Sequence, residues 1–507
     1  MLTSPPLGTD GWDVVSFISI DKINKLWEER WLQEQNAGEA GKKQFLQNIH
    51  CHYEETPVFS TMIYDLDAEL GAPKLTFSGK KADVRIPILQ GKLVITERSG
   101  DQSQSKAFDC SPDADHPAYL LTQVELEKLS GTVEEASVAI QVNKGAFAFE
   151  NFRISETIDV KLADMLTTFF KKEEIPPWVL GTLKTDTDIP FLKPSRFSFR
   201  TYTSEDLFDA SEDHIDVLAL YILTVTKEIP SYGMRRTWPK NKWVVSKDKD
   251  AAVYFSASLM WNQEIHPAMT RAIGENTVIC HNTPPISWSA EFSGTKVLYE
   301  SMYPIKHGYE AGGATLVQEP AVVHFPMNSI TVTMSTVSID SQCAASWKES
   351  FPYQKRTVIP DPDIQDAVLE TGWDDVSFTC SYSASTRAVI DPDTFLITFK
   401  PIKASDPTVT ANFPTTRPWY CSSQTVSQEI VDKAKEKIAK ELTDPSINLS
   451  AMPMFAVSNL LLPQGKVMEP EAVYFPNDLV VVGTGVIAQR EALTRLKKGL
   501  RAKEGQK

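Results

Sequence analysis

Four polar residues in one short stretch have side chains of the types that can bind hard metal ions. They are Asp109, Asp113, Asp115 and His116, in the segment DCSPDADH. Ca²⁺ and Mg²⁺ take clustered oxygen ligands, but the segment lacks the glycine of an EF-hand loop and Pro117 follows directly. We therefore predict a polar loop here, with no metal site.

No common catalytic or cofactor motif accompanies these residues. The sequence holds no G-x-S-x-G nucleophile turn, no H-E-x-x-H zinc helix and no P-loop. Gly483 and Gly485 form a G-x-G pair, but the third glycine of a dinucleotide-binding fingerprint is missing. We predict a non-catalytic protein that uses no cofactor.

Six cysteines are spread along the chain without a C-x-x-C pair or a histidine at zinc spacing. They are Cys51, Cys110, Cys280, Cys343, Cys380 and Cys421. We interpret them as reduced core thiols. One or two disulfides, or a reactive thiol, are the alternatives.

A basic run with two tryptophans is a candidate for membrane contact. Its candidate contact residues are Arg235, Arg236, Trp238, Lys240, Lys242 and Trp243. Tryptophan suits the interface between membrane and water, and each Lys or Arg near an anionic surface contributes ~1 kcal/mol. The run could bind phospholipid headgroups, but a hairpin with its turn at 239–242 and solvated charges is the simpler interpretation.

Two helical stripes of apolar residues could line a ligand tunnel. The first contains Ile158, Leu162, Met165 and Phe169, and the second contains Ile430, Ala434, Ile438 and Leu442. Burying an acyl chain between such surfaces gains ~0.8 kcal/mol per methylene group. The same spacing is typical of an ordinary packed core, which is the simpler interpretation.

Strands must supply most of the framework that positions these residues. Alternation of apolar and polar side chains predicts strands at 74–77, 82–88, 196–202, 330–334 and 394–399. The apolar run 217–223 is far shorter than the ~20 residues of a membrane-spanning helix and predicts a buried strand. A third helical stripe covers residues 20–31. Because the predicted strands outnumber these helical stripes, we expect each helix to lie on the concave face of a curved antiparallel sheet.

Short internal repeats divide the chain into two related units. Gly11-Trp12-Asp13 recurs as Gly372-Trp373-Asp374, and a second pattern at 320–326 recurs at 470–476. The segment between the units is rich in proline, which favours an extended connector. We predict a first β-rich unit at 10–345, a connector at 346–363, a second unit at 364–487 and a basic tail at 488–507.

Charge and hydropathy narrow the function further. The formal net charge is -15 and the pI is near 5.1, which argues against nucleic acid as a partner, because that affinity rests on neutralising phosphates. No signal peptide and no transmembrane segment are visible. We expect synthesis in the cytoplasm, and release without a visible signal peptide stays open.

The two ends of the chain carry the most specific motifs. Asp10-Gly11-Trp12-Asp13-Val14-Val15 lies at one end, and Tyr474-Phe475-Pro476-Asn477-Asp478-Leu479 at the other. These motifs resemble accessory proteins encoded beside botulinum neurotoxins, namely the OrfX group and its forty-seven-kilodalton relative, in the tubular lipid-binding (TULIP) superfamily. The resemblance implies an α+β, β-dominated fold in which long curved antiparallel sheets wrap around long amphipathic helices.

The resemblance also implies a role. The implied role is that of a bacterial, non-catalytic accessory protein that is encoded in a toxin gene cluster. Such a protein would bind a lipid or other apolar ligand, partner proteins, or both. A ligand-free interaction module of a toxin complex is one alternative. A carbohydrate-binding β-protein is another, motivated by the 11 tryptophans, and exposure of Trp238, Trp243 and Trp419 would distinguish it.

Overall fold

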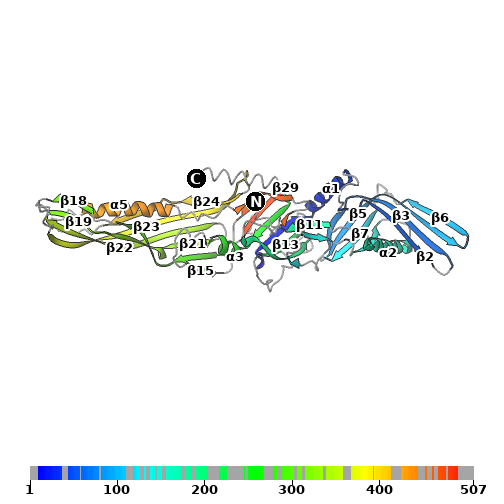
Figure 1. Ribbon diagram of the computed structural model, residues 1–507, viewed down its shortest axis with the longest axis horizontal. Helices are drawn as coiled ribbons and strands as arrows, with labels where there is room; N and C mark the ends of the chain where they lie inside the picture. Colours follow the sequence, from blue (N-terminus) through cyan, green and yellow to red (C-terminus); the bar gives the residue numbers. More distant parts are fainter. Residues whose placement is uncertain are drawn as a thin grey trace.

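The structure is a computed structural model of the 507-residue chain. It describes residues 9–36, 44–56, 59–78, 81–109, 118–125, 131–132, 137–140, 142, 145–150, 156–172, 178–183, 190–203, 216–224, 245, 249–265, 267, 278–283, 287–301, 305–310, 314–334, 338–357, 367–391, 393–394, 396–412, 424–443, 452–453, 460–461, 466–474 and 478–488. The described strands form five antiparallel sheets in an elongated molecule (Figure 1).

A seven-stranded sheet, which we call the central sheet, lies in the middle of the molecule (Figure 1). In spatial order its strands are β28 (Lys466–Tyr474), β29 (Leu479–Ala488), β14 (Ala251–Phe255), β1 (Val14–Ser19), β13 (Val217–Thr224), β12 (Pro194–Tyr202) and β8 (Gly131–Thr132). Every residue of β1, β13 and β14 is buried, because both faces of the sheet carry apolar clusters. The predicted buried strand at 217–223 is thereby confirmed.

A second seven-stranded sheet, the distal sheet, forms one end of the molecule (Figure 1). Its path is β10 (Ala146–Glu150), β7 (Tyr119–Glu125), β5 (Lys81–Ser99), β3 (Thr61–Leu70) and β2 (Asn48–Glu55), and β4 (Lys74–Ser78) and β6 (Gln102–Asp109) also pair with β5. Buried and exposed residues alternate along β2 and β5, so one face of the sheet packs on the core and the other meets solvent.

A ten-stranded sheet occupies the opposite end and is built on two long neighbouring strands, β22 (Ile339–Thr357) and β23 (Val368–Ile390). The others are β15 (Val278–Thr283), β16 (Ser287–Phe292), β18 (Ile305–Glu310), β19 (Ala314–Gln318), β21 (Ile330–Met334), β24 (Leu396–Ala404), β25 (Thr408–Asn412) and β26 (Met452–Pro453). Two small sheets complete the set: β27 (Leu460–Leu461) with β11 (Trp178–Leu183) and β9 (Ser137–Ile140), and β17 (Thr295–Glu300) with β20 (Val322–Pro326).

Helices form at the three segments with helical apolar spacing. They are α1 (Ile20–Asn36), α2 (Glu156–Lys172) and α5 (Gln424–Thr443), and a short α3 (Ala257–Met260) follows β14. The α1 stripe is buried from Ile20 to Trp31. Its Trp27 forms a cluster of three aromatic rings with Phe45 and Trp178, at centroid distances of 5.2 to 5.7 Å.

The expectation of long curved sheets wrapped around long amphipathic helices is wrong. The fold is β-dominated, but its strands are divided among several separate sheets, and α1, α2 and α5 contain only 17, 17 and 20 residues. A 20-residue helix extends about 30 Å, whereas a strand the length of β23 extends about 75 Å. Each helix is therefore too short to serve as the axis of the fold: α2 packs on β10 and β2 of the distal sheet, whereas α1 contacts β4 of the distal sheet and β1 of the central sheet.

The predicted unit boundaries are not tested by this arrangement and stay a prediction. Residues 346–357 of the expected connector belong to β22, and β29 of the second unit pairs with β14 of the first. Among the described helices, none combines the length and apolarity needed to cross a membrane.

Candidate functional site

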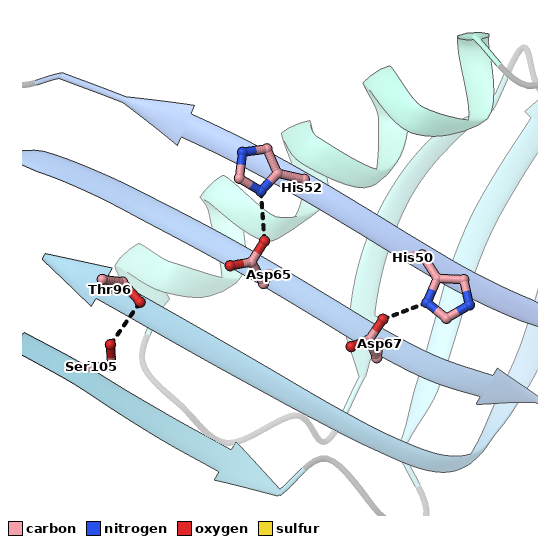
Figure 2. A network of polar contacts seen from close by, with 6 residues as sticks. All are labelled: His50, His52, Asp65, Asp67, Thr96 and Ser105. Atoms are coloured by element: carbon pink, nitrogen blue, oxygen red, sulfur yellow. Dashed lines mark hydrogen bonds and ion pairs between the residues drawn. The ribbon is translucent and has the colours of Figure 1, made fainter.

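The outer face of the distal sheet carries polar side chains aligned across four strands. Figure 2 shows this face, with α2 behind the sheet. The strand register places His50 opposite Asp67, Asp67 opposite Lys92, and Lys92 opposite Asp109. Basic and acidic residues therefore alternate in one row that crosses β2, β3, β5 and β6.

Two histidines of β2 are each held by an aspartate of β3. Nδ1 of His52 lies 2.6 Å from Oδ1 of Asp65, and Nδ1 of His50 contacts Oδ1 of Asp67 (Figure 2). The His52 and His50 side chains are 62% and 78% exposed, so each pair contributes at most about 1 kcal/mol to stability. The pairs orient the imidazole rings and leave each Nε2 directed away from its aspartate.

A hollow of about 590 Å³ opens beside His50 on this face. Its lining includes Asn48, Glu69 and Gln90, which occupy the neighbouring row of the sheet, together with Lys92. Volumes of roughly 300–1,000 Å³ are typical of small-molecule sites. The hollow is therefore large enough for a small ligand or for side chains of a partner protein.

The lining of the hollow mixes hydrogen-bond donors and acceptors. Within the described part of the chain, the side chains of Asn48, Glu69, Gln90 and Lys92 make no hydrogen bond or ion pair. Amides both donate and accept, a carboxylate accepts, and an ammonium group donates. This composition suits a polar ligand that also carries donors and acceptors, and Ala68, Ala107 and Phe108 add apolar surface to the lining.

Asp109 is the one residue of the DCSPDADH segment that the structure describes, and it lines the hollow. The other residues of that segment lie outside the described residues. Within the described ranges, no group of three or more His, Cys, Asp or Glu side chains is placed to hold a metal ion.

The apolar stripe of α2 faces the inner side of the distal sheet. Leu162 and Met165 are 0% and 3% exposed, and Ile158 and Phe169 pack against the same core cluster. Phe170 stacks on Phe147 of β10 at a centroid distance of 4.0 Å. This burial is common to a packed core and to a filled tunnel, so the ligand-lining role stays a prediction.

The stripe of α5 is buried in the same way at the opposite end of the molecule. Ile430 and Ala434 belong to a cluster with Val376 and Phe378 of β23, and Ile438 joins the main core. The side chain of Leu442 lies outside the described residues. A lining role for this stripe also stays a prediction.

The basic run predicted to contact headgroups lies outside the described residues. This applies to Arg235, Arg236, Trp238, Lys240, Lys242 and Trp243, and also to Trp419. Their role stays a prediction.

A polar contact ties α2 to the edge of the distal sheet. The ammonium group of Lys161 binds the Glu55 carboxylate of β2, which also accepts a 3.1 Å hydrogen bond from the Tyr64 hydroxyl. The hydrogen bond from Lys161 lowers the pKa of Glu55, and the same bond raises the pKa of Lys161. The contact holds the helix over the inner face while the outer face stays open.

The histidines and aspartates of the outer face were not predicted as a site. A signal was available, because His50 and His52 are two residues apart and so are Asp65 and Asp67. That spacing places each pair on one face of a strand. Only the register between β2 and β3 brings the two pairs together.

Comparison with known proteins gives a likeness of fold. No protein-family model and no curated protein matches the sequence. P47 from Clostridium botulinum A2 is similar in structure, with a TM-score of 0.53 and 12% identity, over 96% of this chain and 99% of that one. P47 of Clostridium botulinum E1 has a TM-score of 0.52 and 11% identity, over 94% and 99%. The chain therefore has a P47-like fold.

Proposed function

We propose that this chain is a non-catalytic accessory protein of a bacterial toxin gene cluster, related to P47 and the OrfX group, that acts by binding. The observation that carries the proposal is the likeness of fold to two P47 proteins over almost their whole length. The motifs at the two ends of the chain support the same relationship. The proposed partners are proteins encoded by neighbouring genes.

The outer face of the distal sheet is the proposed contact surface for such a partner. Its hollow offers unengaged amide, carboxylate and ammonium groups on a sheet, and hydrogen bonds from such groups give specificity at interfaces. The test is co-purification of the tagged full chain with the products of neighbouring genes. We expect a stable complex, which the double substitution Glu69→Ala and Lys92→Ala weakens.

A matched control lies on the same face. Thr96 and Ser105 hydrogen-bond to each other at 2.9 Å but lie outside the hollow. Their double substitution to alanine should leave the complex intact. If no neighbouring gene product binds the wild-type chain, the accessory role is refuted. If both double variants bind a partner equally well, the accessory role stands and the outer face is refuted as the contact surface.

The second part of the proposal is an apolar or lipid ligand held against the stripe of α2, against that of α5, or one against each. Buried Leu162 and Ile438 are the side chains that would contact it. Native mass spectrometry of the purified chain, followed by solvent extraction, should reveal a bound lipid. Absence of lipid, together with no binding to phosphatidylcholine vesicles containing phosphatidylserine, would eliminate this part and leave a ligand-free interaction module.

Carbohydrate binding is a second candidate function, and the hollow is the observation that favours it. Sugar hydroxyl groups donate and accept hydrogen bonds, which matches the mixture of Asn48, Glu69, Gln90 and Lys92. Calorimetric titration with maltotriose and with chitotriose tests this function. Binding that Glu69→Ala abolishes and Thr96→Ala preserves would support it, whereas no heat from either sugar would count against it.

A further inference from the structure

Two cysteines that are far apart in the sequence are neighbours in the ten-stranded sheet. Cys343 of β22 lies opposite Tyr382 of β23, and Cys380 of β23 lies opposite Ala345 of β22. The cysteines are therefore diagonal neighbours on adjacent antiparallel strands. Residues two apart on a strand point to the same face, so both thiols lie on one side of the sheet.

The pair is embedded in the core and is surrounded by hydrogen-bond donors. Cys343 and Cys380 are 4% and 2% exposed, and both thiols are free. The Cys380 thiol and the backbone N–H of Ala345 face Sγ of Cys343. The hydroxyl of Ser329 lies 3.9 Å from the same sulfur, but it donates its proton to the carbonyl oxygen of Pro326. Two donors thus face one sulfur atom.

This environment makes the two thiols chemically unequal. The hydrogen bond from Cys380, helped by the backbone N–H of Ala345, lowers the pKa of Cys343 against the opposing effect of burial. The same bond and burial raise the pKa of Cys380. Cys343 is therefore the nucleophile of the pair, since the thiolate is the reactive form of cysteine, and Cys380 keeps its proton.

We propose that Cys343 and Cys380 form a redox-active dithiol that hydrogen peroxide converts to a disulfide linking β22 and β23. This is a modification site independent of the accessory role. Low-pKa, solvent-accessible cysteines next to a second, resolving cysteine are the usual targets of such oxidation; because this pair is buried, peroxide reaches it when the sheet opens locally. The six cysteines are otherwise distributed without any sequence motif that would indicate a pair.

The reaction proceeds in two steps. The Cys343 thiolate attacks one oxygen of hydrogen peroxide, the O–O bond breaks, and Cys343 becomes a sulfenic acid while hydroxide leaves and is protonated to water. Sγ of Cys380 then attacks the Cys343 sulfur, an S–S bond forms, the S–O bond breaks, and the departing hydroxide takes the Cys380 proton as a second water. Two thiols lose two electrons, and one peroxide is reduced to two waters.

Closing the bond requires a local movement of the two strands. Diagonal neighbours on antiparallel strands have Cα atoms roughly 7–8 Å apart, and disulfides need a closer approach. The pairing of β22 with β23 around residues 343–345 and 380–382 must therefore shift. Hydrogen exchange of these amides reports the shift.

The test is peptide mapping by mass spectrometry of the full chain before and after treatment with hydrogen peroxide. Cys51 is an internal control, because it is a free thiol 4% exposed, as Cys343 is, and its strand β2 lies in another sheet. We expect the Cys343–Cys380 disulfide to form roughly tenfold faster than Cys51 is oxidised, because the lowered pKa of Cys343 increases its thiolate fraction and a resolving thiol lies beside it. Dithiothreitol should restore both thiols.

Single variants distinguish a pair from two independent thiols. In Cys380→Ser, Cys343 should stop at sulfenic acid, which dimedone traps, and in Cys343→Ser the Cys380 thiol should stay reduced. Cys51→Ser should leave formation of the disulfide unchanged. The proposal is overturned if the wild-type pair oxidises no faster than Cys51, or if Cys343 and Cys380 are oxidised without being joined to each other.

Discussion

Asp478 accepts a 2.7 Å hydrogen bond from the backbone N–H of Ala257, which lies 221 residues away in the sequence. The bond joins the start of β29 to the start of α3, beside β14. Burial raises the pKa of Asp478 to about 7, although hydrogen bonds from the backbone of Ala257 and Thr9 oppose the rise. One carboxyl group at the centre of the molecule therefore titrates near neutrality.

Stability should fall as the pH rises through this range. An aspartate in the unfolded chain titrates near ~3.9, so between about pH 4 and pH 7 the folded state keeps a proton that the unfolded state has lost. The stabilisation is complete below the lower value and is lost above the higher one. Chemical denaturation of wild type at pH 5.5 and at pH 8 should show a difference that Asp478→Asn reduces.

The matched control is Asp432→Asn, at an exposed carboxylate on α5. It should leave the difference between the two pH values unchanged. An Asp478→Asn protein with the full wild-type difference would contradict the assignment.

Two substitutions on α2 distinguish a packed core from a lipid tunnel. Leu162 is fully buried, and Val160 on the same helix is 60% exposed. In a packed core Leu162→Ala should lower the free energy of unfolding by about 2–4 kcal/mol, while Val160→Ala changes it by less than about 0.5 kcal/mol. Urea denaturation measures both. A small loss in Leu162→Ala would favour a tunnel, where a ligand already replaces protein contacts.

Gly483 of β29 has no room for a side chain. A Cβ atom at this position would lie 2.0 Å from the carbonyl oxygen of Glu469 in β28. Gly483→Ala should therefore push β28 and β29 apart and lower the Tm by several degrees, as overpacking costs about 1–3 kcal/mol.

Gly100→Asn serves as the comparison. Gly100 has φ of +59° and no atom within 4 Å of a Cβ position, and asparagine tolerates this backbone region. Its Tm should stay within a few degrees of wild type. An equal decrease in Tm in the two glycine variants would show that the close contact between β28 and β29 does not determine the effect of Gly483→Ala.

Two aspartates of opposite burial should differ in their contribution to stability. Asp13 is 1% exposed and accepts hydrogen bonds of 2.9 Å from both the backbone N–H and the hydroxyl of Thr224. Asp13→Ala leaves these buried donors unpaired and should cost about 1–3 kcal/mol. Asp67→Ala removes an exposed partner of His50 and should cost less than about 1 kcal/mol. Denaturant titration measures the free energy of unfolding of both variants. A larger loss in Asp67→Ala than in Asp13→Ala would contradict the prediction.

Local patterns predicted the elements of this fold better than their arrangement. Alternation identified strands and the 3.6-residue stripes identified the helices, because both are properties of neighbouring residues. The division into separate sheets depends on which strands pair, and residues far apart in the sequence decide that. The expectation of long sheets wrapped around long helices failed at this step.

The repeated tripeptide shows the same limit for single residues. Trp12 is 1% exposed and packs against Tyr221 at 5.5 Å, whereas Trp373, in the matching position, is 68% exposed. At Gly372 a Cβ would lie 2.5 Å from the ring of Tyr353, so a larger residue there would have to displace that side chain. Identical residues therefore meet different surroundings, and the cross-strand pairs of His50 and of Cys343 were missed because register is equally invisible in a pattern.

The pairing of β29 with β14, and of β14 with β1, has a consequence for biosynthesis. β1 is translated long before β29, and the sheet around it cannot be completed until residues 479–488 have been made. Contacts of such sequence separation form slowly, and apolar surface exposed in the meantime favours aggregation. The nascent chain must therefore keep the apolar residues of β1 and β14 shielded until β29 has been translated, so the sheet in the middle of this molecule matures later than the strands between β1 and β29 that pair only with one another.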